Sequence, residues 1–216
     1  MMNLFDGILY INLAKRKDRR KNLEAELLRV GADPQKVFRI EGYHDELNGT
    51  RGCLYSHIEA LEFAIIKGWK NVLILEDDCR FTANKEQIDL YIRNFLQFFQ
   101  ENWDVFFLGT LLKISYPTAH EEYLRVLFSF HSHAYAVNGP YLPKLKDHFC
   151  TIYDSMREDL FFTSSLEKAL DRQWITLQLS DRWLVGKQMI ARQGRSYSDI
   201  EKEVKPHRLY ARLYNL

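Results

Sequence analysis

Short apolar runs alternate with longer amphipathic segments along most of the chain. Residues 7–13 (GILYINL) are apolar and rich in β-branched and aromatic side chains, which predicts a strand. Leu23, Leu27 and Val30 then recur at i, i+4 and i+7 among charged residues. This spacing predicts an amphipathic helix over residues 17–30.

The rest of the chain continues the alternation. The pattern predicts strands at residues 36–41, 71–75, 103–108, 123–128, 133–137 and 174–179, and helices at 53–67, 85–100, 140–149 and 155–171. The run at 71–75 is continuously aliphatic, as expected for a strand covered on both faces. We therefore expect an α/β fold, with a mixed sheet and helices on both faces.

Length, composition and net charge indicate how many domains the chain forms and which partners its charge does not favour. With 216 residues, and about 150 residues per domain as a guide, one domain over residues 1–216 is expected, with 201–216 as a C-terminal tail. The hydrophobic share of 46% is that of a folded globule. Because 30 Lys and Arg face 29 Asp and Glu, no overall field favours nucleic acid or an anionic membrane.

The cysteines and the N-terminal segment indicate the compartment. Cys53, Cys79 and Cys150 are odd in number and widely spaced, which matches neither a disulfide framework nor a zinc knuckle. The first apolar run has no basic segment before it, and no run approaches the length of a membrane span. We expect a cytoplasmic protein that does not cross a membrane.

Three consecutive acids follow the most hydrophobic predicted strand. In an extended chain Glu76 and Asp78 would point to one face, about 6 to 7 Å apart, and Asp77 to the other. Two such charges repel unless a cation lies between them, and oxygen ligands favour Mg²⁺ or Mn²⁺. In open α/β sheets, ligands bind where strands end. The alternative is a solvated strand end that caps the next helix.

Three blocks of sequence together resemble glycosyltransferase family 25. They are YINL with RKDRR, then RGCLYSH, then LILEDDCRF, in this order. Weaker similarities are HAYAVNGPYLPKL, EDLFF and SYSDI further along. The family includes lipopolysaccharide glycosyltransferases and collagen galactosyltransferases. The resemblance covers residues 5–200 and implies a GT-A type, Rossmann-like fold that binds a UDP-sugar through a divalent metal.

The resemblance also assigns donor-binding residues. The basic run opens a helix, whose free N–H groups attract anions, so nucleotide contacts are expected from this region. The implied donor-binding residues are Asn12, Leu13, Arg16, Arg19, Ser56, His57 and Asp77. A solvated helix face explains the basic run equally well, and a helical histidine is more often a packed residue.

The remaining candidate residues are a catalytic base and the metal ligands. Inverting transfer needs a base for the acceptor hydroxyl, and Asp159 in EDLFF is our candidate, with Glu158 and Asp154 as neighbours that helical spacing could substitute. The implied metal ligands are Glu76, Asp78 and His207. Asp199 in SYSDI is expected to be structural.

His131 and His133 alternate on a predicted strand and would share a face. No Cys or carboxylate stands at a fitting distance in the sequence, so a zinc site is not expected. His133 is instead predicted to line the acceptor cleft.

The sequence thus predicts a hexosyltransferase that uses Mn²⁺ or Mg²⁺ to move galactose or glucose from UDP to a hydroxyl of a glycan, a lipid-linked glycan or a protein. The tail, 201–216, has an apolar stripe that suits packing on the body, or peripheral membrane association. Two other classes are a metal-dependent nucleotidyltransferase or phosphohydrolase, and a non-catalytic module that binds nucleotide sugars or glycans.

Overall fold

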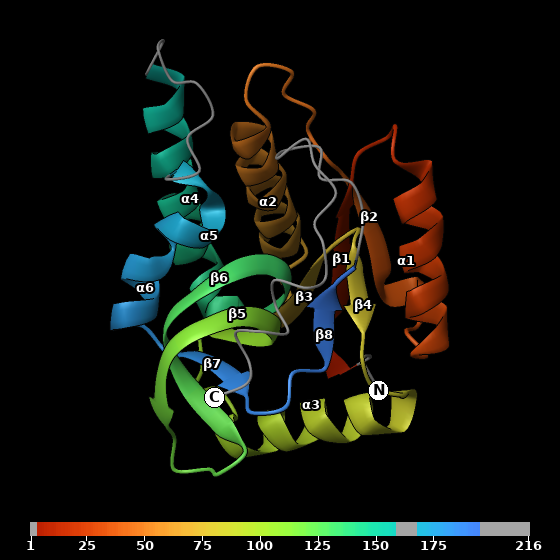
Figure 1. Ribbon diagram of the computed structural model, residues 1–216, viewed down its shortest axis with the longest axis vertical. Coiled ribbons are helices and arrows are strands. Elements are labelled where there is room, and N and C mark those ends of the chain that lie inside the picture. Colours follow the sequence, from red (N-terminus) through yellow and green to blue (C-terminus); the bar gives the residue numbers. More distant parts are fainter. Residues whose placement is uncertain (1–3, 159–167, 195–216) are drawn as a thin grey trace.

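A six-stranded mixed sheet forms the centre of the protein (Figure 1). The computed structural model describes residues 4–158 and 168–194. The strands are β1 (Gly7–Asn12), β2 (Val37–Glu41), β3 (Asn71–Glu76), β4 (Cys79–Phe81), β5 (Val105–Pro117), β6 (Tyr123–Asn138), β7 (Trp183–Gly186) and β8 (Ala191–Gln193). The sheet order is β2-β1-β3-β6-β5-β7, and among these six strands only β6 runs against the others. β4 and β8 form a separate antiparallel pair.

Helices cover both faces of the sheet, as the sequence predicts. They are α1 (Lys17–Arg29), α2 (Gly49–Ile66), α3 (Lys85–Phe99), α4 (Leu142–Glu158), α5 (Leu170–Gln173) and α6 (Ile175–Ser180), with 3₁₀ turns at Pro34–Lys36 and Gly139–Tyr141. α1 and α3 share one hydrophobic core with the sheet, and α2, α4, α5 and α6 share the core on the opposite face. Within the described ranges, no helix is long and apolar enough to cross a membrane.

Local chemistry fixes the ends of the helices that flank the site. The Asn48 side chain accepts the Arg51 N–H and starts α2, and Asn84 forms a capping box with Gln87 at the start of α3. Gly31 follows α1 with φ of +71°, a left-handed conformation that glycine adopts without a steric penalty. These signals explain why α1, α2 and α3 form where periodicity predicts them.

The second half of the chain departs from the predicted elements. The strands expected at 123–128 and 133–137 are one continuous strand, β6. The helix expected at 140–149 lies within α4, which continues to Glu158. The described parts of the helix expected at 155–171 belong to the end of α4 and the start of the short α5, and its residues 159–167 lie outside the described residues. The strand expected at 174–179 is wrong, because Trp174, Leu177 and Gln178 are buried at helical spacing and form α6 with its N-cap.

Candidate functional site

The parallel strands β1, β2 and β3 end at one edge of the sheet, and polar side chains gather there. Asn12 is the last residue of β1 and is buried. Its Nδ2 donates to the Asp77 carboxylate at 2.8 Å and to the Arg16 carbonyl oxygen at 3.0 Å. Arg39, on β2, donates to the Asn12 Oδ1 and carbonyl oxygens. Asn12 therefore joins the ends of β1 and β2 to the acids that follow β3.

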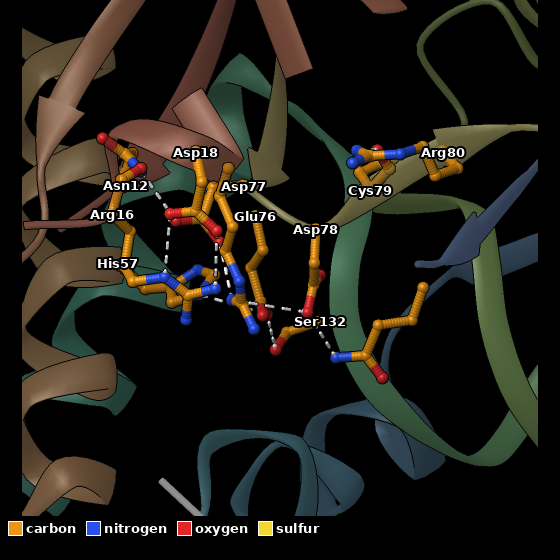
Figure 2. Close-up of polar contacts among 12 residues, drawn as sticks. Asn12, Arg16, Asp18, His57, Glu76, Asp77, Asp78, Cys79, Arg80 and Ser132 are labelled. Atoms are coloured by element: carbon orange, nitrogen blue, oxygen red, sulfur yellow. Dashed lines mark hydrogen bonds and ion pairs between the residues drawn. The ribbon is translucent and has the colours of Figure 1, made fainter. Parts of the chain in front are cut away.

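The three acids do not continue the strand. Glu76 ends β3, Asp77 and Asp78 form a turn, and Cys79 begins β4. The extended backbone assumed in the prediction therefore ends at Glu76, because the chain turns at Asp77 and Asp78. Figure 2 shows Glu76 and Asp78 pointing toward Ser132, while Cys79 points away from this cluster.

Arg19, from the first turns of α1, lies between two of the acids. One guanidinium nitrogen is 2.8 Å from Asp77 Oδ1 and 3.7 Å from Asp78 Oδ2. Burial raises the pKa of Asp77, and the charge of Arg19 together with the Asn12 hydrogen bond opposes that rise. A cation in this place reduces the cost of burying two adjacent carboxylates.

Glu76 is held by a different set of partners. Its Oε1 accepts a hydrogen bond from the Ser132 hydroxyl and lies 3.7 Å from His57 Nε2. The other ring nitrogen of His57 is 2.8 Å from the Tyr135 hydroxyl. Burial acts to raise the pKa of Glu76, but the neighbouring His57 imidazole and the Ser132 hydroxyl lower it below its ordinary value. The carboxylate is therefore kept ionised inside the protein.

Asp78 is the acid best placed to bind a cation. Gln193 Nε2 donates to its Oδ2 at 3.2 Å, whereas its Oδ1 is buried and has no hydrogen-bond partner among the described residues. Burial, and next the negative charge of Glu76, raise the pKa of Asp78 to about 7. A buried carboxylate oxygen without a donor is costly unless a ligand supplies positive charge.

A metal ion fits this oxygen only with ligands from elsewhere. In the part of the chain that the structure describes, no group of three or more His, Cys, Asp or Glu side chains is arranged to hold a metal. Glu76 Oε1 and Asp77 are already engaged by Ser132, Asn12 and Arg19. Mg²⁺ commonly takes one or two protein carboxylates and completes its shell with phosphates and water. Asp78 meets that requirement.

Three other predicted donor-binding residues, Leu13, Arg16 and Ser56, also lie near the ends of these strands, and each is held by a different contact. Arg16 is the N-cap of α1 and pairs with Asp18 at 3.1 Å. Leu13 follows β1 and packs beside Gly42, the residue after β2. The Ser56 hydroxyl donates to the Gly52 carbonyl oxygen and accepts the Tyr43 N–H, so it attaches the loop before α2 to that helix.

The rings of His131 and His133 lie side by side, with centroids 6.0 Å apart, which agrees with the predicted shared face. His131 has φ of +71°, in the left-handed region that is uncommon inside a strand. His133 is 3% exposed, so it lies in the interior beside Gly109 and Ala191, which contradicts the prediction that it lines a cleft. Burial lowers the pKa of His133 to about 4, although the charge of Glu76 opposes this.

Some predictions lie outside the described residues: Asp159, Asp199, His207 and the tail 201–216. Two residues of the site were missed from the sequence, namely Arg39 and Ser132, and the contact of Gln193 with Asp78 was not predicted. Each reaches the acids or Asn12 from a strand whose position in the sheets is set by topology. The strand–turn signal at 71–81 identifies the acids but gives no indication of these partners.

The fold and this edge of polar residues define the class as a GT-A-like α/β protein. A mannose-1-phosphate geranyltransferase of Thermus thermophilus aligns with a TM-score of 0.50 and 12% identity, over 86% of this chain and 75% of that chain. A glycosyltransferase involved in the glycosylation of the major capsid of PBCV-1 aligns with a TM-score of 0.51 and 14% identity, over 83% and 80%. At these identities the likeness shows the fold alone.

Sequence relatives give the family resemblance. The inactive glycosyltransferase 25 family member 3 of Homo sapiens is 26% identical over 49% of this chain and 22% of that protein. Procollagen galactosyltransferase 2 of Mus musculus is 26% identical over 49% of this chain and 21% of that protein. The chain thus spans about a fifth of the length of the curated relatives it matches. No protein-family model matches the chain. The resemblance to glycosyltransferase family 25 is confirmed, and the matches include both a transferase and a protein named inactive.

Proposed function

We propose that the chain is a metal-dependent hexosyltransferase that uses a UDP-sugar and a hydroxyl acceptor on a glycan or protein, with inversion at the anomeric carbon. The observation that carries the proposal is Asp78 Oδ1, a buried carboxylate oxygen at the carboxyl edge of β3 that receives no hydrogen bond from the described part of the chain. This is where open α/β sheets bind ligands. The match to a procollagen galactosyltransferase supports the transfer of a hexose.

The chain's own residues divide the work of binding the donor. Asn12 and Arg39 fix the end of β1, beside which the nucleotide is expected to lie. Arg19 presents a guanidinium next to Asp77 and Asp78, where it can neutralise charge on a diphosphate. Mn²⁺ or Mg²⁺, held by Asp78, would act as a Lewis acid on the departing diphosphate.

Sugar release and transfer test this proposal together. The chain is incubated with UDP-, GDP- and CMP-sugars, with and without Mn²⁺, in the presence of glycan and peptide acceptors. We expect turnover with a UDP-hexose only when the metal is present. Turnover that is unaffected by chelation would contradict the metal dependence, and exclusive use of GDP- or CMP-sugars would contradict the assigned donor.

A second candidate is a non-catalytic module that binds nucleotide sugars. The observation that favours it is that the human relative, at 26% identity, is named inactive. Such a module would bind UDP in the presence of Mn²⁺ and give no turnover with any acceptor. The two candidates therefore differ in turnover and not in donor binding.

A further inference from the structure

Asp171, on α5, is held by β6 next to the residue that holds Glu76, although it is far from the acids in the sequence. Its Oδ2 accepts the backbone N–H of His131 at 2.9 Å, and the side chain is half-buried. α5 itself contacts both β6 and α2. The next residue of β6, Ser132, donates to Glu76. Two neighbouring residues of one strand thus hold two carboxylates from different elements.

The Cys53 side chain lies within electrostatic range of both carboxylates. Cys53 lies one helical turn before His57 on α2. Burial raises the pKa of the Cys53 thiol, and the negative charges of Glu76 and Asp171 raise it further. The negative charges of both acids therefore act on the same thiol, near the start of α2.

A structural role alone does not account for a carboxylate at this position. Any neutral acceptor, such as the oxygen of an asparagine, would satisfy the single N–H of His131. His131 also holds φ of +71°, an unfavourable conformation for a residue other than glycine, and such strain is commonest at functional sites.

The sheet order places Asp171 on the side from which an acceptor would approach. Across the sheet the order is β2, β1, β3, β6, so Asn12 and Arg39 come first, Asp78 follows, and α5 packs on β6 beyond them. In-line displacement requires the attacking hydroxyl to lie opposite the departing diphosphate. A base beyond β3 meets that requirement, whereas Asp77 and Asp78 lie on the diphosphate side.

We propose that Asp171 is the base that takes the proton of the acceptor hydroxyl, an inference that rests on the proposed transferase function. The hydroxyl oxygen forms the new bond to the anomeric carbon, and the bond from that carbon to the diphosphate breaks. The electron pair of the broken bond leaves with the diphosphate, and the hydroxyl proton moves to the Asp171 carboxylate. The His131 N–H keeps this carboxylate oriented.

Asp171→Asn, Asp171→Ala and Asp159→Asn test the assignment, with Asp147→Asn as the control for loss of an exposed acid on α4. Because Asn still accepts the His131 N–H, Asp171→Asn should keep the melting temperature, the donor Kd and the acceptor KM. Its kcat should fall by roughly 10²- to 10⁴-fold. Asp171→Ala should lose kcat to the same extent and also melt at a lower temperature.

The other possible results would overturn the role of Asp171 or assign it to another residue. Full kcat in Asp171→Asn would overturn the assignment, and loss confined to Asp159→Asn would give the role to Asp159. A donor Kd that weakens in Asp171→Asn would make Asp171 a donor-binding residue instead. If the unsubstituted chain gives no transfer while it still binds UDP, the transferase function fails first, and the role of Asp171 fails with it.

Discussion

Replacing Arg19 with methionine removes the cation between Asp77 and Asp78 while keeping most of the side-chain volume. The Arg19 side chain is 13% exposed and those of the two acids 8% and 9%, so this is a buried cluster. Loss of one partner of a buried ion pair costs roughly 3 to 5 kcal/mol. The pKa of both acids is already raised, so they can take up protons, and we expect the lower value, about 3 kcal/mol.

Thermal and urea unfolding measure this effect. For a protein of this size about 3 kcal/mol corresponds to a fall in melting temperature of roughly 6 to 12 °C. Arg20→Met is the matched control, because Arg20 is exposed and solvent screens its pair with Glu24. Equal melting temperatures for Arg19→Met and Arg20→Met would refute the role of Arg19.

The pH dependence of the stability of Arg19→Met is a second test of the role of Arg19. Without Arg19, the folded-state pKa of Asp77 and Asp78 rises further above the unfolded value. A group with a raised folded pKa destabilises the fold when it is ionised, and protonation relieves that cost. The stability deficit of Arg19→Met should therefore shrink as the pH falls toward about 7, because Asp78 takes up its proton at a higher pH in the variant than in the unsubstituted chain, where its pKa is about 7. A deficit that grows on acidification would contradict this.

Three further substitutions test the frame around the site. Asn84→Ala removes the capping box of α3 and should cost about 1 kcal/mol by urea unfolding; an unchanged midpoint would exclude the cap. Gly186→Ala places a Cβ 1.7 Å from the Tyr91 hydroxyl and should lower stability by about 1 to 3 kcal/mol, unless the ring can move aside. Ser132→Ala removes a donor to the Glu76 carboxylate and should cost about 1.5 to 3 kcal/mol, so full stability would mean that this hydrogen bond contributes nothing.

Local patterns predicted those parts of the molecule that local forces decide. The helices α2 and α3 have side-chain caps, α1 is followed by the glycine stop Gly31, and all three have periodic apolar residues within their own sequences. β6 is one strand where the pattern predicts two, because its pairing with β5 continues through Ser129 and Phe130. The segment of α6 was predicted as a strand because it is apolar and contains β-branched residues. The helical spacing of its buried side chains was not taken into account.

Local spacing alone predicted the site only where its residues are close in sequence, and the family resemblance added Asn12, Arg19 and His57, which the fold brings to the acids. Glu76, Asp77 and Asp78 stand together, so their common position at a strand end could be inferred. Ser132 and Asp171 reach the same region because β6 lies next to β3 and α5 packs on β6. No spacing in the sequence indicates that neighbour relationship, so both residues became visible only in the fold.

Calorimetric titration with UDP tests the central claim most directly. The account predicts that UDP binds tightly only with Mn²⁺ present, and that Asp78→Asn, which keeps the size of the side chain, abolishes the metal-dependent part of the affinity without lowering the melting temperature. Asp147→Asn, on the exposed face of α4, should bind like the unsubstituted chain. Metal-dependent affinity that survives in Asp78→Asn would contradict the assignment of Asp78 as the ligand at the end of β3.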